Sequence, residues 1–209
     1  MTVDYTLYLC TDRNLMTTDT LEEAVKAAIR GGVTVVQLRE KDCSSAEFLE
    51  QAFRIKEITD RAGIPLIIND RLDVALAVDA AGVHVGQSDF PATVARRLLG
   101  PDKLIGVSAA TVEEARKAEA DGADYLGVGA MFATSTKTNT RPVSMERLAE
   151  IRQAVSIPIV AIGGIQASNA AQFRGTGING LAVVSAILAQ PDIEEAARKL
   201  KNIFTGEYI

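Results

Sequence analysis

The sequence has few of the residues on which several common enzyme classes depend. Its 209 residues include one histidine, His84, two cysteines, Cys10 and Cys43, and no tryptophan. A Ser-His-Asp hydrolase therefore has little support, and we interpret His84, which lies inside an apolar run, as a core histidine with satisfied hydrogen bonds. The cysteines lack metal-binding spacing and do not indicate a disulfide framework.

An excess of positive charge is also missing. The chain has 22 lysines and arginines against 27 aspartates and glutamates, a net charge of −5, and no basic run. This argues against a nucleic-acid partner. The N-terminus does not resemble a signal peptide, and the apolar runs reach only about half a membrane span. We expect a cytoplasmic protein with no nucleic-acid or membrane partner, and the sequence leaves a homo-oligomer open.

Eight β-rich runs alternate with helical patterns along the chain. Most of the runs are nearly continuous valine, isoleucine and leucine, as in parallel strands buried on both faces. No linker divides the chain, so we predict a single domain over residues 1–209. Strict alternation favours a (β/α)8 (TIM) barrel, although pattern alone leaves an open eight-stranded sheet possible. The predicted strands are residues 5–11, 33–38, 65–69, 82–86, 104–108, 124–129, 157–161 and 179–184.

Pairs of residues three positions apart mark the starts of several predicted helices. A serine, threonine or aspartate followed three residues later by glutamate has the spacing of a helix capping box. Four pairs have this spacing: Asp19 with Glu22, Ser44 with Glu47, Thr111 with Glu114, and Asp192 with Glu195.

Two aspartates follow neighbouring predicted strands. Asp70 ends the third strand and Asp89 the fourth. The carboxyl ends of all strands in a TIM barrel lie on one face, where the active site forms. Mg²⁺ is commonly held by one or two carboxylates together with water and substrate phosphates, so the pair suits a magnesium site. Alternatively, each aspartate caps the helix that follows it.

Two cations follow the second predicted strand. Alternation along the strand places Gln37 and Arg39 on one side, and Lys41 follows. Arginine offers phosphate a bidentate fork and lysine a point charge. The alternative is a solvated loop in which these cations pair with Glu40 or Asp42.

Strands seven and eight end in small residues, Gly163-Gly164 and Val184-Ser185. Many TIM barrels bind phosphate at these two loops through backbone N–H groups, although a glycine pair can also simply make a tight turn. The segment 134–140 after strand six is rich in hydroxyl groups, and it is either a functional loop or an ordinary surface loop. Gly175–Gly180 spells G-x-G-x-x-G but precedes a strand, so we discount it as a dinucleotide motif.

Taken together, these motifs resemble the thiamine-phosphate synthase family over nearly the whole chain. The matching segments are Gln37-Leu38-Arg39-Glu40-Lys41, Asn69-Asp70, His84-Val85-Gly86-Gln87-Ser88-Asp89, Gly106-Val107-Ser108, Thr134-Ser135-Thr136-Lys137, Gly163-Gly164-Ile165 and Val184-Ser185-Ala186.

The resemblance implies a transferase of thiamine biosynthesis with two small phosphorylated substrates and Mg²⁺ as cofactor. It would join 4-amino-2-methyl-5-(diphosphooxymethyl)pyrimidine to a thiazole phosphate and release diphosphate. The implied pyrimidine diphosphate site is Gln37, Leu38, Arg39, Glu40, Lys41, Asn69, Ser108 and Lys137, of which Arg39, Lys41, Ser108 and Lys137 would be catalytic. The implied thiazole phosphate site is Thr134, Ser135, Thr136, Gly164, Val184 and Ser185, with Asp70 and Asp89 as metal ligands.

Three other functions remain open at this point. A thiazole tautomerase would keep the barrel and the phosphate site, but it has little use for the cations and carboxylates of a diphosphate clamp. A phosphosugar isomerase or aldolase needs a base or a Schiff-base lysine at the end of a strand. Lys137 lies too far along its loop to be a natural candidate for that lysine. A non-catalytic sensor would bind both ligands without turnover.

Overall fold

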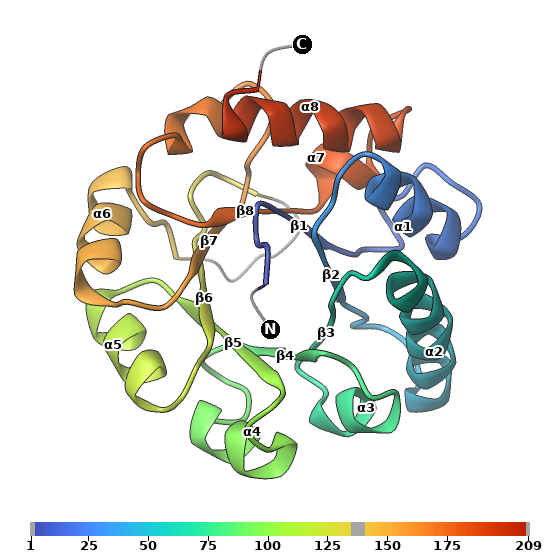
Figure 1. Ribbon diagram of the computed structural model, residues 1–209, viewed down its shortest axis with the longest axis horizontal. Coiled ribbons are helices and arrows are strands. Elements are labelled where there is room, and N and C mark those ends of the chain that lie inside the picture. The colour runs from blue at the N-terminus through green and yellow to red at the C-terminus, as the bar shows by residue number, and fades with distance from the viewer. Residues whose placement is uncertain (1–2, 135–140, 208–209) are drawn as a thin grey trace.

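Eight parallel strands close into one barrel in the computed structural model, which describes residues 3–134 and 141–207. The strand order follows the chain, and β8 pairs with β1, aligning Val183 with Leu9. Figure 1 shows the helices as a ring around these strands. The TIM barrel is confirmed and the open sheet is excluded. The strands are β1 (Leu7–Cys10), β2 (Val35–Leu38), β3 (Leu66–Asn69), β4 (Gly82–Val85), β5 (Leu104–Ala109), β6 (Tyr125–Val128), β7 (Ile159–Ile162) and β8 (Gly180–Val183).

The apolar residues of each strand serve two cores. In β1, Leu7 and Leu9 pack outward into the layer shared with the helices, whereas Tyr8 and Cys10 point into the barrel interior. Such alternation buries both faces of every strand, which explains the nearly continuous apolar runs.

A helix follows most strands and packs against the outside of the barrel. No helix in the described part of the chain is long and apolar enough to cross a membrane. The helices are α1 (Leu21–Arg30), α2 (Ser45–Ala62), α3 (Leu72–Ala77), α4 (Ala92–Leu99), α5 (Val112–Ala120), α6 (Met145–Ala154), α7 (Ser185–Leu188) and α8 (Ile193–Thr205), with a 3₁₀ turn η1 (Ala170–Phe173).

The predicted helix starts are correct in three of four cases. Ser44 forms a complete capping box with Glu47, and the side chains of Thr111 and Asp192 each accept the N–H three residues on. The prediction for Asp19 is wrong, because Thr20 caps α1 in a box with Glu23. Both hydrogen bonds of that box form one residue later than the Asp-led spacing indicated.

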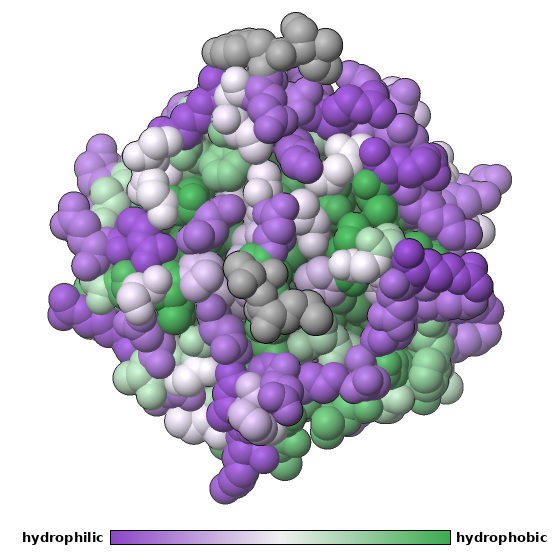
Figure 2. Space-filling view, viewed as in Figure 1, coloured by the Kyte–Doolittle hydropathy of each residue, from purple (hydrophilic) through white to green (hydrophobic). Residues whose placement is uncertain are grey.

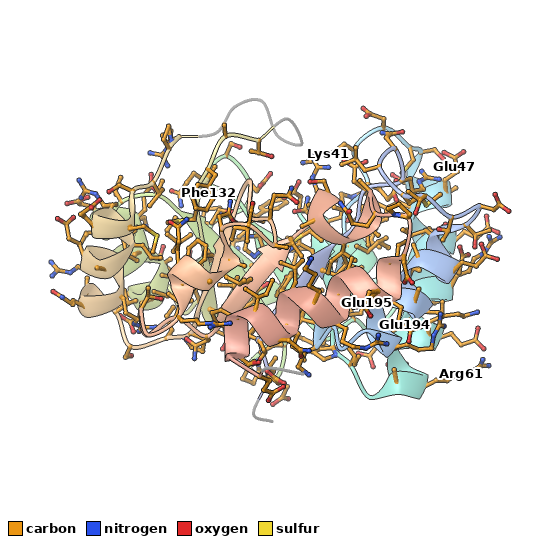
Figure 3. The ribbon with its side chains drawn as sticks, turned by 90° about the horizontal axis from the view of Figure 1, so that it is seen from above. Lys41, Glu47, Arg61, Phe132, Glu194 and Glu195 are labelled. Carbon is orange, nitrogen blue, oxygen red and sulfur yellow. The ribbon has the colours of Figure 1, made fainter. Side chains whose placement is uncertain are left out.

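Polar side chains cover much of the face seen in Figure 2, and apolar ones gather toward its lower right, over α2 and α3. The exposed large apolar residues include Phe53 on α2, Leu76 on α3 and Leu98 on α4. The carboxyl ends of the strands lie on the opposite side of the barrel, which is the upper side in Figure 3, where Lys41 and Phe132 are labelled.

Candidate active site

A cavity of about 610 Å³ lies at the carboxyl ends of the strands. It brings together most of the residues that the motifs predicted. The predicted residues that line it are Gln37, Arg39, Lys41, Asn69, Asp70, Asp89, Ser108, Thr134, Gly164, Val184 and Ser185.

The remaining predicted residues divide into two groups. Leu38 is fully buried in the outer core, and Glu40 lines a second, smaller cavity of about 420 Å³, which shares Arg39 and Lys41 with the main one. Ser135, Thr136 and Lys137 lie outside the described residues. The placement of Leu38 follows from strand alternation, because its neighbours Gln37 and Arg39 both face the main cavity.

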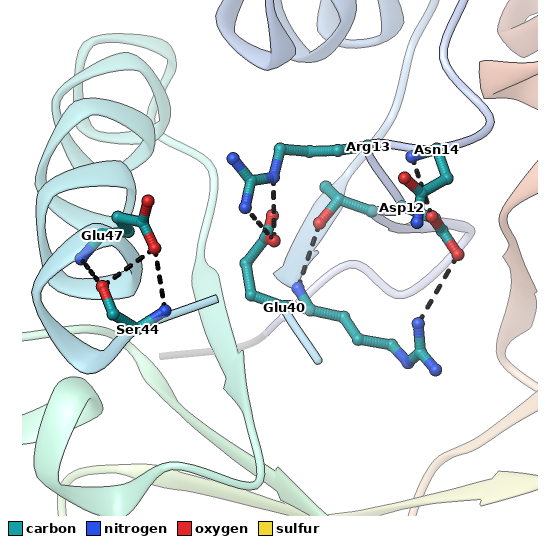
Figure 4. A network of polar contacts seen from close by, with 8 residues as sticks. Asp12, Arg13, Asn14, Glu40, Ser44 and Glu47 are labelled. Carbon is teal, nitrogen blue, oxygen red and sulfur yellow. Dashed lines mark hydrogen bonds and ion pairs between the residues drawn. The ribbon is translucent and has the colours of Figure 1, made fainter. Parts of the chain in front are cut away.

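The loop after β1 holds Arg39 in place (Figure 4). The Arg39 backbone N–H donates to Thr11 Oγ1 at 3.0 Å, and its guanidinium lies 3.6 Å from a carboxylate oxygen of Asp12. Lys41 pairs with Asp70. The structure therefore pairs these two cations with Asp12 and Asp70, and not with Glu40 or Asp42. Arg39 and Lys41 stay on the wall of the main cavity.

Glu40 supports the β1 loop from the other side. Its Oε2 accepts a hydrogen bond from Arg13 Nε at 2.9 Å and forms an ion pair with Arg13 Nη2 at 2.8 Å, as Figure 4 shows. Its Oε1 is buried with no hydrogen-bond partner among the described residues. Burial raises the pKa of this carboxyl, although Arg13 opposes the shift. Since Glu40 lies outside the main cavity and is bonded to Arg13, its assignment to the pyrimidine diphosphate stays a prediction.

Neither Asp70 nor Asp89 caps a helix. The capping positions of α3 and α4 are Arg71 and Pro91, and neither helix has a side-chain cap. Asp70 adopts a left-handed backbone conformation, with φ of 62°, which is uncommon for a residue other than glycine. The Asp89 carboxylate accepts the Gly86 N–H at 2.8 Å. The capping interpretation is therefore wrong at both positions, and both residues line the main cavity.

Gly164 allows the β7 loop to pack closely on the segment after β6. Its φ is 63°, and a Cβ at this position would lie 2.5 Å from the Ala133 carbonyl oxygen and 2.8 Å from the Cβ of Phe132. The Asn169 side chain donates to the Gly164 carbonyl at 3.1 Å. The positive φ and this close packing therefore explain the glycine, and Gly164 lines the same cavity as Thr134 and Ser185.

Sequence reasoning missed several residues that line the cavity. Tyr8 and Cys10 of β1 belong to it, and alternation along that strand is the signal that could have found them. Burial raises the pKa of the Cys10 thiol to about 12, so the thiol stays protonated near neutral pH and does not act as a nucleophile. Arg141 also lines the cavity, and its Nη2 donates to both carboxylate oxygens of Glu114, at 2.7 and 2.8 Å.

His84 is a buried histidine with hydrogen bonds, as expected. Its Nδ1 lies 3.1 Å from the Tyr125 hydroxyl and its Nε2 lies 3.0 Å from Ser108 Oγ. It also lines the cavity, which the sequence interpretation did not include.

Comparison with known proteins identifies the family. The sequence profile of the family described as thiamine monophosphate synthase matches residues 7–187. The chain is a member of this family. The thiamine-phosphate synthase of Clostridium beijerinckii is 61% identical over 202 residues, covering 97% of each chain. The protein of the same name from Ruminiclostridium cellulolyticum is 60% identical over 205 residues, covering 98% of each chain.

A solved structure of the same family has this barrel. The thiamine phosphate pyrophosphorylase of Pyrococcus furiosus superposes with a TM-score of 0.90 at 39% identity, covering 97% of this chain and 96% of that one. The resemblance drawn from the motifs is confirmed for the family and for the fold.

Proposed function

We propose that the chain is a thiamine-phosphate synthase, which joins an aminopyrimidine diphosphate to a thiazole phosphate and releases diphosphate. One observation carries the proposal. A single cavity has cations and carboxylates at β2 to β4 and the glycine and serine loops at β7 and β8. These two groups lie on opposite sides of the barrel and so can hold two anionic substrates against each other.

The carboxylates suit a magnesium ion. Asp70 and Asp89 follow adjacent strands and face one cavity with hard oxygen atoms, while the described residues contain no group of three or more potential ligands. Such a site fits Mg²⁺, which commonly takes one or two carboxylates and completes its shell with water and phosphate oxygens. When bound, the ion supplies positive charge that stabilises the departing diphosphate.

Arg39 and Lys41 would bind the diphosphate. Thr11 holds the Arg39 backbone, and the Asp12 carboxylate attracts its guanidinium, so less conformational freedom is lost when a ligand binds. Its guanidinium can take two phosphate oxygens at once, and Lys41 adds a point charge. Gln37, Asn69 and Ser108 would contact the pyrimidine diphosphate, and the assignment of Lys137 to the diphosphate stays a prediction.

The chemistry needs electrostatic stabilisation and protection from water rather than a protein nucleophile. We propose that the diphosphate leaves first and that the thiazole nitrogen captures the resulting pyrimidine methylene cation. Arg39 and Lys41 stabilise the charge that develops on the leaving group. The cavity positions the nitrogen and limits access of water to the cation. Cytoplasmic location and the oligomeric state stay predictions.

A coupling assay tests the function. The purified chain is mixed with both substrates, with and without Mg²⁺, and thiamine phosphate and diphosphate are measured. We expect equal amounts of both products and a strong dependence on Mg²⁺. Binding of both ligands without any diphosphate release would instead support the sensor, and conversion of the thiazole phosphate alone would support the tautomerase.

Two variants test the carboxylates. We expect Asp70→Ala and Asp89→Ala each to lower turnover by about 10²-fold, about 2.7 kcal/mol of barrier. The loss should be largest at low Mg²⁺. Asp79→Ala is the control, because Asp79 is exposed and is not among the residues that line the cavity. Full turnover of either site variant at low Mg²⁺ contradicts the metal assignment.

A further inference from the structure

A chain of hydrogen bonds between side chains crosses the interior of the barrel beneath the cavity. Gln37 Nε2 donates to the Tyr8 hydroxyl at 2.8 Å, and that hydroxyl lies 2.8 Å from the hydroxyl of Tyr125. The Tyr125 hydroxyl meets His84 Nδ1 at 3.1 Å, and His84 Nε2 meets Ser108 Oγ at 3.0 Å. The chain thus joins five strands and both ends of it line the cavity.

The donors and acceptors give this chain a direction. The Tyr8 hydroxyl accepts a hydrogen bond from the Gln37 amide, so it can donate its own proton in a hydrogen bond to the Tyr125 hydroxyl. The Tyr125 hydroxyl in turn donates a hydrogen bond to His84 Nδ1. A neutral imidazole that accepts at Nδ1 carries its proton on Nε2, and it therefore donates to Ser108. Every inner group then donates one hydrogen bond within the chain.

The opposite direction leaves a proton without a place in the chain. If Ser108 donated to His84 and Tyr125 donated to Tyr8, the Tyr8 hydroxyl would receive two hydrogen bonds, one from Tyr125 and one from the Gln37 amide. Its proton would then have no acceptor in the chain, inside a core where Tyr8 is 1% exposed. An unsatisfied buried donor is costly, so the first direction is favoured.

The backbone leaves space for these rings. A Cβ at Gly106 would collide with the ring of Tyr125 and lie 2.5 Å from His84 Nδ1. A Cβ at Gly127 would lie 3.0 Å from His84 Cε1. Glycine is thus required at position 106 of β5, where the histidine and the tyrosine meet, and a side chain at Gly127 of β6 would be in tight contact with the histidine. This accounts for the glycine in the Gly106-Val107-Ser108 motif.

The two ends of the chain present opposite polarity to the cavity. With its amide nitrogen engaged by Tyr8, Gln37 is left with its carbonyl oxygen, an acceptor, which receives no hydrogen bond from the described residues. Ser108, which accepts from His84, is left with its hydroxyl proton, a donor. An aminopyrimidine is complementary to this pair, because its amino group donates and its ring nitrogen accepts.

We propose that Tyr8, Tyr125 and His84 are positioning residues that fix this polarity and thereby select a 4-aminopyrimidine over its 4-oxo counterpart. The proposal rests on the function proposed above. A 4-oxo ring presents a carbonyl oxygen where the amino group stood, and an N–H where the ring nitrogen accepted. Both contacts then become unfavourable, and a site built around defined hydrogen bonds discriminates strongly against such a ligand.

The test compares the binding of the two pyrimidine diphosphates by calorimetry. In the parent protein we expect the amino compound to bind more tightly by at least about tenfold. Tyr125→Phe removes one hydroxyl and frees the His84 tautomer, so the preference should fall by roughly tenfold. Tyr8→Phe should do the same by freeing the Gln37 amide to turn, and it serves as a second variant if Tyr125→Phe is poorly folded. Affinity for the thiazole phosphate should not change.

Tyr5→Phe is the matched control. The Tyr5 ring packs 5.0 Å from that of Tyr125 in the same interior cluster, but Tyr5 is not a member of the chain. It should keep the parent's preference. If the parent, Tyr125→Phe and Tyr8→Phe all prefer the amino compound over the oxo compound by the same factor, the proposal is overturned, even if the protein couples its substrates normally. If Tyr5→Phe also loses the preference, general packing of the interior cluster and not the hydrogen-bond chain determines it, which contradicts the proposal. Failure of the coupling assay alone would count against the proposed function and leave the binding preference to be judged separately.

Discussion

At the scale of single residues, Asp70 combines a strained backbone with a place in the cavity. Its φ of 62° is matched by only one other non-glycine residue with positive φ in the described chain, the exposed Asp79, with φ of 53°. Each of the two carboxylates also pairs with a lysine, Lys41 and Lys103 respectively. The left-handed conformation costs an L-residue about 1–2 kcal/mol, and strain of this kind is often found at functional sites.

The pair provides a matched test of function against stability. We expect Asp70→Gly to leave the free energy of unfolding unchanged or to raise it by about 1 kcal/mol, because glycine relieves the strain and exposed ion pairs contribute little. Turnover should nevertheless fall by about 10²-fold, as expected for Asp70→Ala. Asp79→Gly should affect stability similarly and retain activity. Urea unfolding and the coupling assay measure both properties, and an active Asp70→Gly variant would contradict the assignment of Asp70 to the site.

At the scale of elements, Glu119 ties α5 to the start of β7. Its Oε1 accepts from the Ser156 N–H at 2.8 Å, from the Ser156 hydroxyl at 2.6 Å and from the Ile157 N–H at 3.2 Å. These hydrogen bonds, those from Ser156 first, lower the pKa of Glu119 below its usual 4.5. The carboxylate form is therefore the one that stabilises the fold.

The sign of this shift predicts how stability depends on pH. A lowered pKa in the folded state contributes stability that is fully present above the unfolded value of 4.5 and is lost as pH falls through the folded value. We expect Glu119→Gln to be less stable than the parent at pH 7 and the difference to shrink as pH decreases below 4.5. Denaturant unfolding at several pH values measures it. A difference that grows on acidification would contradict the role of the carboxylate.

At the scale of the whole molecule, closure of the barrel makes each of the eight strands a neighbour of two others, so none of these strands has an open edge. Tyr5, Tyr8 and Tyr125 lie in the interior cluster, the helices lie outside it, and the sequence has no tryptophan. These are three of the four tyrosines, and the fourth, Tyr208, lies outside the described residues. In a Tyr208→Phe background, tyrosine fluorescence therefore reports on the interior, and far-ultraviolet circular dichroism reports on the outer ring.

We expect both signals to change in one coincident transition on heating or in urea, because the interior and the outer layer share the same eight strands. Addition of the pyrimidine diphosphate with Mg²⁺ should shift both transitions equally, by about 2.7 kcal/mol at a hundred times the dissociation constant. Two separated transitions would show instead that the interior and the helical layer unfold independently.

Much of the fold was predictable because it depends on local pattern. All eight strands lie within two residues of their predicted bounds, since apolar runs and the alternation of side chains are properties of neighbouring residues. The spacing of residues could not predict the first residue of α1. Asp19 and Thr20 are each followed by a glutamate three positions later, so the capping pattern fits both residues equally. Most of the predicted site residues reach one cavity because strand ends necessarily meet in a barrel.

By itself, the sequence determined the eightfold alternation, the order of the motifs and their resemblance to one family. Only the tertiary structure decided the closure of β8 on β1, the pairing of Lys41 with Asp70, and the turn of Glu40 toward Arg13. It also decided the chain from Gln37 to Ser108, whose members come from five strands. The physical reason is that hydrophobic pattern and capping act between near neighbours, whereas hydrogen bonds and ion pairs join whichever side chains the folded barrel brings together.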